Sequence, residues 1–168
     1  MEAKPYSALN RLVQRIASSA AGSWLFARVL HHLDRLVLSW SGGRATLTSY
    51  LSGAPVVLLT TTGARSGLPR TVPLLCIRDR LQPERFALIA SNWGQRRHPA
   101  WYYNLKANPR SHASIDGRAA DYLAREAGGE EYERFWNYAQ ETYFGFPLYK
   151  QRAGERRIPI MVLTPQAD

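Results

Sequence analysis

Apolar residues in the first quarter of the chain recur at spacings of three and four, the period of one face of an α-helix. This pattern predicts one helix over residues 9–20 and a second over residues 24–40, with Ser23 as the N-cap of the second. Gly42 and Gly43 follow and favour the end of that helix. We therefore expect residues 1–45 to form an N-terminal helical segment.

From residue 54 onward, short apolar and β-branched runs replace the helical period. A parallel sheet would need long crossover helices between successive strands, and the chain has no room for them. We therefore expect an α+β fold in which short antiparallel strands form a closed or nearly closed β-barrel that carries helices. The expected strands cover residues 56–62, 71–78, 86–91, 111–115 and 158–163, and the expected helices cover residues 98–107 and 130–140.

The composition narrows the class of protein. A length of 168 residues is sufficient for one domain with a full core, so residues 46–168 are expected to form one structural unit. The formal net charge of +9 indicates an anionic partner: nucleic acid, an anionic lipid surface or a polyanionic small ligand. No nucleic-acid-binding motif accompanies the charge, so a nucleic-acid partner is not expected. A solvated basic surface without a specific partner is the alternative.

Cysteine and histidine usage argues against metal chemistry. The single Cys76 excludes an internal disulfide framework and a cysteine-rich metal site, and it fits a reducing compartment. His31 and His32 are adjacent and so point to different helix faces, which makes a metal pair unexpected. No run of eighteen apolar residues exists, and the N-terminus lacks a signal-peptide core. We expect a cytoplasmic protein without a bound metal.

The segment TTTGARSGLPRT, residues 60–71, is the first that indicates chemistry. Its two glycines can free backbone N–H groups, and Arg65 and Arg70 can offer guanidinium groups to a phosphate or to carboxylates. It is not the nucleotide-triphosphate loop, which needs Gly-Lys followed by Ser or Thr. The segment is interpreted either as an anion-binding loop or as an ordinary polar hairpin.

Two further segments supply aromatic and amide groups. Ser91 and Asn92 leave a strand where a flat heterocycle could dock, and Trp101 and Asn104 are three apart, hence on one face of a helix. An aromatic plane beside an amide suits a ring that has both carbonyl and N–H edges, although Trp101 as plain core is the alternative. Tyr143, Phe146 and Tyr149 recur every three residues. They are interpreted either as a hydrophobic lid or as hydrogen-bond donors to a bound acceptor.

Taken together and in order, the motifs resemble the deazaflavin-dependent nitroreductase family, which includes F420-dependent quinone reductases. They are TTTGARSGLPRTVPL, ASNWG, HPAWYYNLKANP and ERRIPIMVL. The resemblance covers roughly residues 47–165, and HPAWYYNLKANP is specific enough that chance similarity is improbable. It implies a split β-barrel, distantly related to flavin-mononucleotide-binding oxidases. It also implies an oxidoreductase that binds coenzyme F420 and transfers a hydride from its reduced form to a quinone, nitroaromatic or similar conjugated acceptor.

Carried over residue by residue, the resemblance assigns a site. Arg65, Ser66 and Arg70 would face the cofactor's phosphate and polyglutamate tail, and Ser91 would orient the deazaflavin or polarise the acceptor. Tyr143 and Tyr149 would be donors to the acceptor. The implied cofactor-binding set is Ala64, Arg65, Ser66, Arg70, Thr71, Val72, Pro73, Leu74, Leu75, Ala90, Ser91, Asn92, Trp101, Asn104, Leu105 and Phe146. Two positions depart from the family: Asn92 stands where a lysine is usual, and Phe146 where a tyrosine is frequent.

Other functions remain open from the sequence. The same superfold includes flavin-mononucleotide- and haem-using enzymes, and a non-catalytic ligand or lipid carrier is a third possibility. The N-terminal helices combine apolar faces with arginines, which favours peripheral contact with an anionic membrane, although they could equally cover the barrel. The sequence leaves the physiological acceptor and the oligomeric state undetermined.

Overall fold

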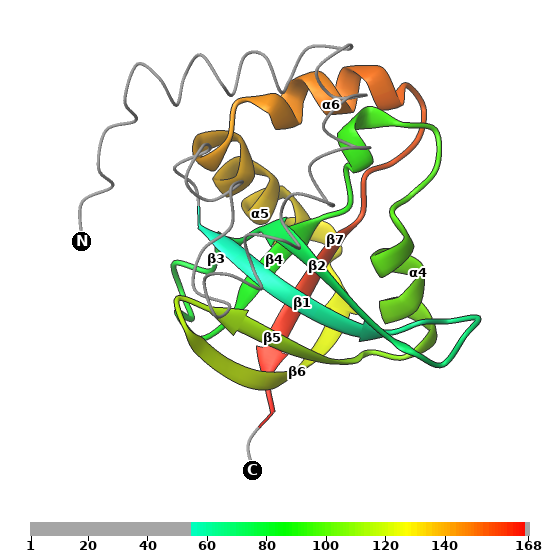
Figure 1. Ribbon diagram of the computed structural model, residues 1–168. Coiled ribbons are helices and arrows are strands. Elements are labelled where there is room, and N and C mark those ends of the chain that lie inside the picture. The colour runs from blue at the N-terminus through cyan, green and yellow to red at the C-terminus, as the bar shows by residue number, and fades with distance from the viewer. Residues whose placement is uncertain (1–54, 167–168) are drawn as a thin grey trace.

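The computed structural model describes residues 55–166 of the chain (Figure 1). The helices expected over residues 9–20 and 24–40, and with them the segment 1–45, lie outside the described residues. Within residues 55–166, no helix has the length and apolar character needed to cross a membrane.

Seven strands form one sheet in which every neighbouring pair is antiparallel. Their order across the sheet is β2-β1-β5-β6-β7-β4-β3. The strands are β1 (Val56–Thr62), β2 (Pro69–Leu75), β3 (Ile77–Arg78), β4 (Phe86–Ile89), β5 (Arg110–Ile115), β6 (Arg118–Glu126) and β7 (Ile160–Pro165). The helices of the described part are the short 3-10 turn η1 (Asn92–Gly94), α4 (Ala100–Ala107), α5 (Gly129–Thr142) and α6 (Gly145–Ala153).

The sheet curls into a half-barrel (Figure 1). β2 and β3 stand at opposite ends of the strand order, yet only Cys76 separates them in the chain. The sheet therefore has to curve until its two edges approach each other. The expected α+β fold, an antiparallel split β-barrel with packed helices, is confirmed. Among residues 55–166, the outer edge of β2 has no strand partner.

Two hydrophobic clusters lie on the two faces of the central strands. Successive side chains in a strand point to opposite faces, so β7 contributes Ile160 and Val162 to one cluster and Met161 and Leu163 to the other. The cluster inside the curl, called the barrel cluster, also contains residues of β1, β4 and α4. The cluster on the opposite face, called the helix cluster, is completed by α5 and α6. Because both faces are covered, β4 and most of β7 are buried.

Some expected boundaries are wrong. The single strand expected over residues 71–78 is two strands, because Cys76 belongs to neither β2 nor β3. Its N–H donates to the backbone oxygen of Pro55 at 2.8 Å, and the chain passes there from one edge of the sheet to the other. The strand expected to reach Ser91 ends at Ile89. The helix expected from His98 begins at Ala100, since Pro99 has an extended backbone conformation. Three elements of the described part were not expected: β6, its longest strand, the short turn η1, and α6.

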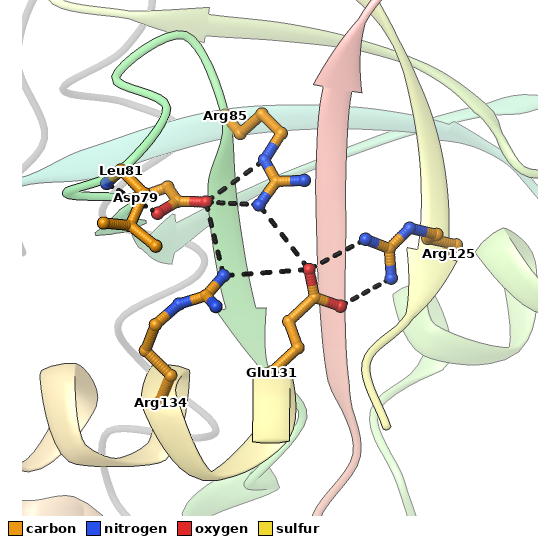
Figure 2. Close-up of polar contacts among 6 residues, drawn as sticks. All are labelled: Asp79, Leu81, Arg85, Arg125, Glu131 and Arg134. Atoms are coloured by element: carbon orange, nitrogen blue, oxygen red, sulfur yellow. Dashed lines mark hydrogen bonds and ion pairs between the residues drawn. The ribbon is translucent and has the colours of Figure 1, made fainter. Parts of the chain in front are cut away.

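A network of ion pairs fastens α5 to the sheet (Figure 2). Asp79, at the β3–β4 hairpin, is only 2% exposed and accepts hydrogen bonds from Arg85 and from the N–H of Leu81. Glu131 on α5 accepts a bidentate pair of bonds from Arg125 on β6. Arg85 and Arg134 lie within 4 Å of both carboxylates and so link the two pairs. The network holds the helix that precedes the aromatic segment 143–149.

Candidate functional site

The β1–β2 connection is a closed turn that exposes its arginines. Gly63 donates its N–H to the backbone oxygen of Leu68 at 2.9 Å. Its own backbone oxygen accepts a hydrogen bond from the N–H of Gly67 at 2.8 Å. A Cβ at Gly63 would lie 2.6 Å from the Ser66 hydroxyl oxygen and 3.2 Å from the Leu68 backbone oxygen, so a side chain there would displace the Ser66 hydroxyl. That hydroxyl accepts weak bonds from the N–H of Leu68 at 3.3 Å and from Arg70 at 3.5 Å. The turn thus holds Ser66 beside Arg70.

Arg65 and Arg70 are both exposed. None of the ion pairs within residues 55–166 involves either residue, whereas Arg78, Arg80, Arg85, Arg125 and Arg134 all have carboxylate partners. Two exposed guanidinium groups in one turn segment, without an acidic partner in the described part, attract an anion. This geometry is compatible with the anion-binding interpretation of residues 60–71, which stays a prediction.

Asn104 anchors the base of this turn to helix α4. Its side-chain oxygen accepts the N–H of Ala64 at 3.0 Å, and its side-chain nitrogen donates to the Thr61 hydroxyl at 3.0 Å. The Asn104 side chain is buried. Since both of its polar atoms bond to the β1–β2 segment, Asn104 fixes the loop that carries Arg65 rather than presenting its amide to solvent.

Strand β2 offers different groups on its two faces. Val72 and Leu74 pack against the barrel cluster, whereas Leu75 packs against the helix cluster. At the start of the strand, the Thr71 and Thr60 hydroxyls are hydrogen-bonded at 2.8 Å across the β1–β2 ladder. Because the outer edge of β2 has no strand partner in the described part, its backbone groups there can bind a ligand.

The loop after β4 has an unusual backbone. Asn92, Trp93 and Gly94 have φ values of 48°, 53° and 78°, so three successive residues are left-handed. Glycine adopts this region freely and asparagine tolerates it, whereas a bulky residue such as Trp93 held there costs on the order of 1–3 kcal/mol. Gly94 is required, since a Cβ would lie 2.6 Å from the Cβ of Arg152 and 2.8 Å from the backbone oxygen of Tyr149 on α6. A strained turn held by its surroundings is frequent at binding sites.

Asn92 closes this turn by donating from its side-chain nitrogen to the backbone oxygen of Arg97 at 2.8 Å. Asn92 is also among the residues that tolerate a left-handed backbone. The Asn92 side chain is therefore used here for local structure. Arg96 and Arg97 are exposed next to it and retain the positive charge of this loop.

Arg156 is a site residue that sequence reasoning missed. Its guanidinium donates to the backbone oxygens of Gln95 at 2.9 Å, Ser91 at 2.7 Å and Ala90 at 3.4 Å, and to Nδ1 of His98 at 2.8 Å. One side chain from the segment before β7 thus binds the whole loop between β4 and α4. The motif ERRIPIMVL contained the residue, but no periodicity or spacing signals a bond over about 60 positions of sequence.

Trp101 and Leu105 belong to the interior. Both pack in the barrel cluster with Ala90, and Val72 and Leu74 pack against the same cluster. Leu105 is 1% exposed, so its side chain supports the floor of the site from within. The structure therefore joins α4, the end of β4 and the inner face of β2 through one cluster.

The aromatic residues from α5 and α6 are buried together. The hydroxyls of Tyr143 and Tyr149 are hydrogen-bonded at 3.0 Å, and the two side chains are 5% and 4% exposed. Phe146 meets the Tyr143 ring edge-on, with centroids 5.4 Å apart. Burial raises the pKa of Tyr143, although the Tyr149 hydrogen bond and Arg152 oppose this rise, so its phenol is protonated at neutral pH. Trp93 packs against the same cluster, which brings the strained turn next to the tyrosines.

The basic turn and the cluster that contains the tyrosine pair lie at opposite ends of strand β2. The basic turn lies at its first residue, and Leu75 at its last packs against the helix cluster that contains both tyrosines. From Arg70 to Leu75 the strand rises about 17 Å, at roughly 3.3 Å per residue. An elongated ligand with an anionic end and a flat ring fits such an edge. The residues present are compatible with F420, whose tail is polyanionic, because the exposed Arg65 and Arg70 would offer cations to such a tail.

Comparison with known proteins agrees with this arrangement. The family model of F420H(2)-dependent quinone reductases matches residues 36–165. A protein named F420H(2)-dependent quinone reductase from Mycobacterium tuberculosis is 32% identical over 128 residues, which cover 74% of this chain and 84% of that protein. A solved F420-H2 dependent reductase is 39% identical with a TM-score of 0.59, covering 65% of this chain and 93% of that chain.

A second solved structure, described as a domain-swapped dimer, is 32% identical with a TM-score of 0.61 and covers 86% of this chain and 99% of that one. The match of the family model extends over most of the chain and includes the basic turn, strand β2, the loop after β4 and the tyrosine pair. The chain therefore belongs to the F420H(2)-dependent quinone reductase family, a family of oxidoreductases that use coenzyme F420.

Proposed function

We propose that this chain binds reduced F420 along the outer edge of β2 and reduces a quinone held against the helix cluster. The observation that carries the proposal is the position of β2 itself. One end of the strand lies at two exposed arginines without acidic partners in the described part, and the other packs against the cluster that contains the Tyr143–Tyr149 pair. A cofactor laid along this edge has its tail in the basic turn and its ring near the tyrosines.

Each part of the site has a role in this proposal. Arg65, Ser66 and Arg70 bind the phosphate and carboxylates of the tail through charge-assisted hydrogen bonds. Asn104 keeps that turn in place from α4. The exposed backbone edge of β2 from Thr71 to Leu75, and the segment Ala90–Asn92, contact the ring, while Trp101 and Leu105 support them from inside.

Bound F420 supplies a hydride from C5 of its reduced form, and a proton completes the reduction of the acceptor. In this proposal the tyrosine pair donates a hydrogen bond to the acceptor oxygen on which negative charge develops, and Ser91 orients the ring or polarises the acceptor. The two phenols form a hydrogen-bonded pair, so a proton given by one can be replaced through the other. Burial raises the pKa of Tyr143, so its phenol stays neutral and able to donate.

A turnover assay tests the acceptor class. Purified protein is mixed with reduced F420 and either a short-chain quinone or a nitroaromatic compound, and the return of oxidised F420 is followed by absorbance. We expect reduction of the quinone, with the nitroaromatic as a slower substrate. Failure to oxidise reduced F420 with any acceptor, while oxidised F420 still binds, would favour a carrier. Tighter binding of flavin mononucleotide than of F420 would favour a flavin enzyme of the same superfold.

We also propose that the N-terminal segment brings the protein to an anionic membrane surface from the cytoplasmic side. The support is its sequence alone, two amphipathic patterns with Arg11, Arg15, Arg28 and Arg35, and the fact that long-tailed quinones reside in lipid. Co-sedimentation with anionic and neutral liposomes at low salt tests it. Recovery of the full-length protein in the supernatant with both vesicles would assign these helices to the barrel instead.

A further inference from the structure

We propose that Arg156 is a positioning residue for F420 binding, which holds the loop of residues 91–98 in its left-handed shape through a bond that requires neutral His98. The inference rests on the proposed function, because that loop meets the cofactor ring there. Neither Arg156 nor His98 has a role in the proposed hydride and proton transfer.

The number and placement of the bonds distinguish Arg156 from an ordinary structural arginine. A guanidinium has five N–H donors, and four hydrogen bonds from this one go to a single loop. Three of the acceptors are backbone oxygens, at Ala90, Ser91 and Gln95. The bonds thus bracket the left-handed turn, with Ala90 and Ser91 before it and Gln95 directly after it. Without these bonds the turn would relax toward an ordinary conformation.

The fourth bond, to Nδ1 of His98, determines the protonation state and the tautomer of the imidazole. Arginine has no acceptor atom, so Nδ1 of His98 must accept and cannot carry a proton. The proton of the neutral ring is therefore on Nε2. A second proton on His98 would remove the acceptor and place two positive charges together. The loop is thus bound tightly only while His98 is neutral.

The groups that face His98 agree with a neutral ring. Arg156 approaches from the segment before β7, Glu126 lies on β6, and Tyr102 and Tyr103 of α4 pack against the imidazole. Burial, followed by the charge of Arg156, lowers the pKa of His98, and Glu126 only partly opposes this. Glu126 itself is engaged by the hydroxyl of Tyr102 and by Lys106. Because the folded-state pKa lies below the unfolded one, the stabilisation is complete above the ordinary histidine pKa and is lost as the pH falls through the lowered one.

The first test uses the protein without ligand. Hydrogen–deuterium exchange is measured for the peptide covering residues 90–99 in the wild type, in Arg156→Ala and in Arg157→Ala, which removes the same charge one residue away. We expect faster exchange in Arg156→Ala within this peptide and unchanged exchange in β1. Exchange in residues 90–99 that is equal in Arg156→Ala and wild type would overturn the proposal. Arg156→Lys, which keeps the charge but cannot serve four acceptors, replaces the alanine variant if the latter does not fold.

The second test measures the affinity for oxidised F420. We expect the dissociation constant to rise by about tenfold or more in Arg156→Ala, as for a misplaced ligand-binding group, and by less than about twofold in Arg157→Ala. His98→Asn keeps an acceptor oxygen near the place of Nδ1 and cannot be protonated. The wild type should therefore lose affinity as the pH falls through the lowered pKa of His98, and His98→Asn should not. An identical acid loss in both, or wild-type affinity in Arg156→Ala, would contradict the proposal. If the wild type does not bind F420 at all, the proposed function fails, and the exchange measurement still decides whether Arg156 holds the loop.

Discussion

The side-chain oxygen of Asn104 on α4 accepts the backbone N–H of Ala64, the residue before Arg65, at 3.0 Å. Forty positions of sequence separate the two residues. The bond ties the helix of the HPAWYYNLKANP motif to the basic turn of the TTTGARSGLPRT motif. The two motifs are thus parts of one structure, in which a buried amide sets the position of an exposed cation.

Removal of the Asn104 amide should destabilise the fold and loosen the turn. In Asn104→Leu the buried Thr61 hydroxyl loses a donor and the Ala64 N–H loses its acceptor. We expect the free energy of unfolding to fall by about 1–3 kcal/mol, the cost of unsatisfied buried groups. Urea denaturation measures this. Asn108→Ala, which removes an exposed local bond to the N–H of Arg110, is the control and should cost less than about 1 kcal/mol. Equal losses in the two variants would contradict the anchoring role of Asn104.

The ion-pair network in Figure 2 should contribute far more to stability than the exposed pairs. Asp79→Ala leaves Arg85 and Arg134 without their buried carboxylate, and we expect a loss of about 3–5 kcal/mol. The matched control is Asp116→Asn, which removes the charge but keeps a residue type that tolerates the left-handed φ of 52° at this position; its pair with Arg78 has side chains 73% and 48% exposed. It should cost at most about 1 kcal/mol. Similar midpoints for the two variants in urea would show that the network is not coupled to folding.

The pH dependence of unfolding in acid should also depend on this ion-pair network. Burial alone would raise the pKa of Asp79, but hydrogen bonds from Arg85 and the Leu81 N–H, with the charges of Arg85 and Arg134, lower it overall. The pKa of Glu131 is also lowered, chiefly by its hydrogen bonds from Arg125. Both groups therefore stabilise the fold fully above the ordinary carboxyl pKa values of about 4, and this stability is lost as the pH falls through the lowered values. In Asp79→Ala, the free energy of unfolding should vary less with pH in that range; the same slope as in the wild type would refute this.

Much of the fold could be predicted because its strands carry the expected pattern. The β-branched run of β1 gave its bounds, and α5 was found within two residues at each end. β6 was missed because eight of its nine side chains are not buried and it has no β-branched residue. α6 was missed because Gly145 and Pro147 argue against a helix. Pro147 is tolerated there because the first turn of a helix does not need its N–H groups.

The site was predictable only in part, for a physical reason. Local motifs predicted that Arg65, Ser91 and Asn104 belong to one site, but they could not show that the Asn104 amide bonds to the protein itself. They also gave no sign of Arg156, whose four acceptors are mostly backbone oxygens. Every residue has a backbone oxygen. The amino-acid sequence of a loop therefore does not reveal which of its backbone oxygens an arginine will bind.

The tyrosine pair should act on the acceptor and not on the cofactor. In Tyr143→Phe or Tyr149→Phe, one hydroxyl of the 3.0 Å pair is lost. We expect kcat with a quinone to fall by about tenfold or more, while the dissociation constant of F420 changes little. Since burial raises the pKa of Tyr143, the wild-type rate should not decline with rising pH below about 10. Wild-type kcat in both variants would leave the tyrosines as a hydrophobic lid.

The central claim, that the basic turn at the start of β2 holds the anionic end of F420, is tested most directly by titrating oxidised F420 into Arg70→Ala at several salt concentrations. The control is Arg118→Ala, an exposed arginine at the start of β6 that removes the same charge elsewhere. We expect Arg70→Ala to weaken binding by about 1.5–3 kcal/mol, as for a hydrogen bond to a charged group, which is roughly 10- to 150-fold. Its remaining affinity should also depend less on salt than that of the wild type. Wild-type affinity in Arg70→Ala, or equal losses in the two variants, would contradict the claim.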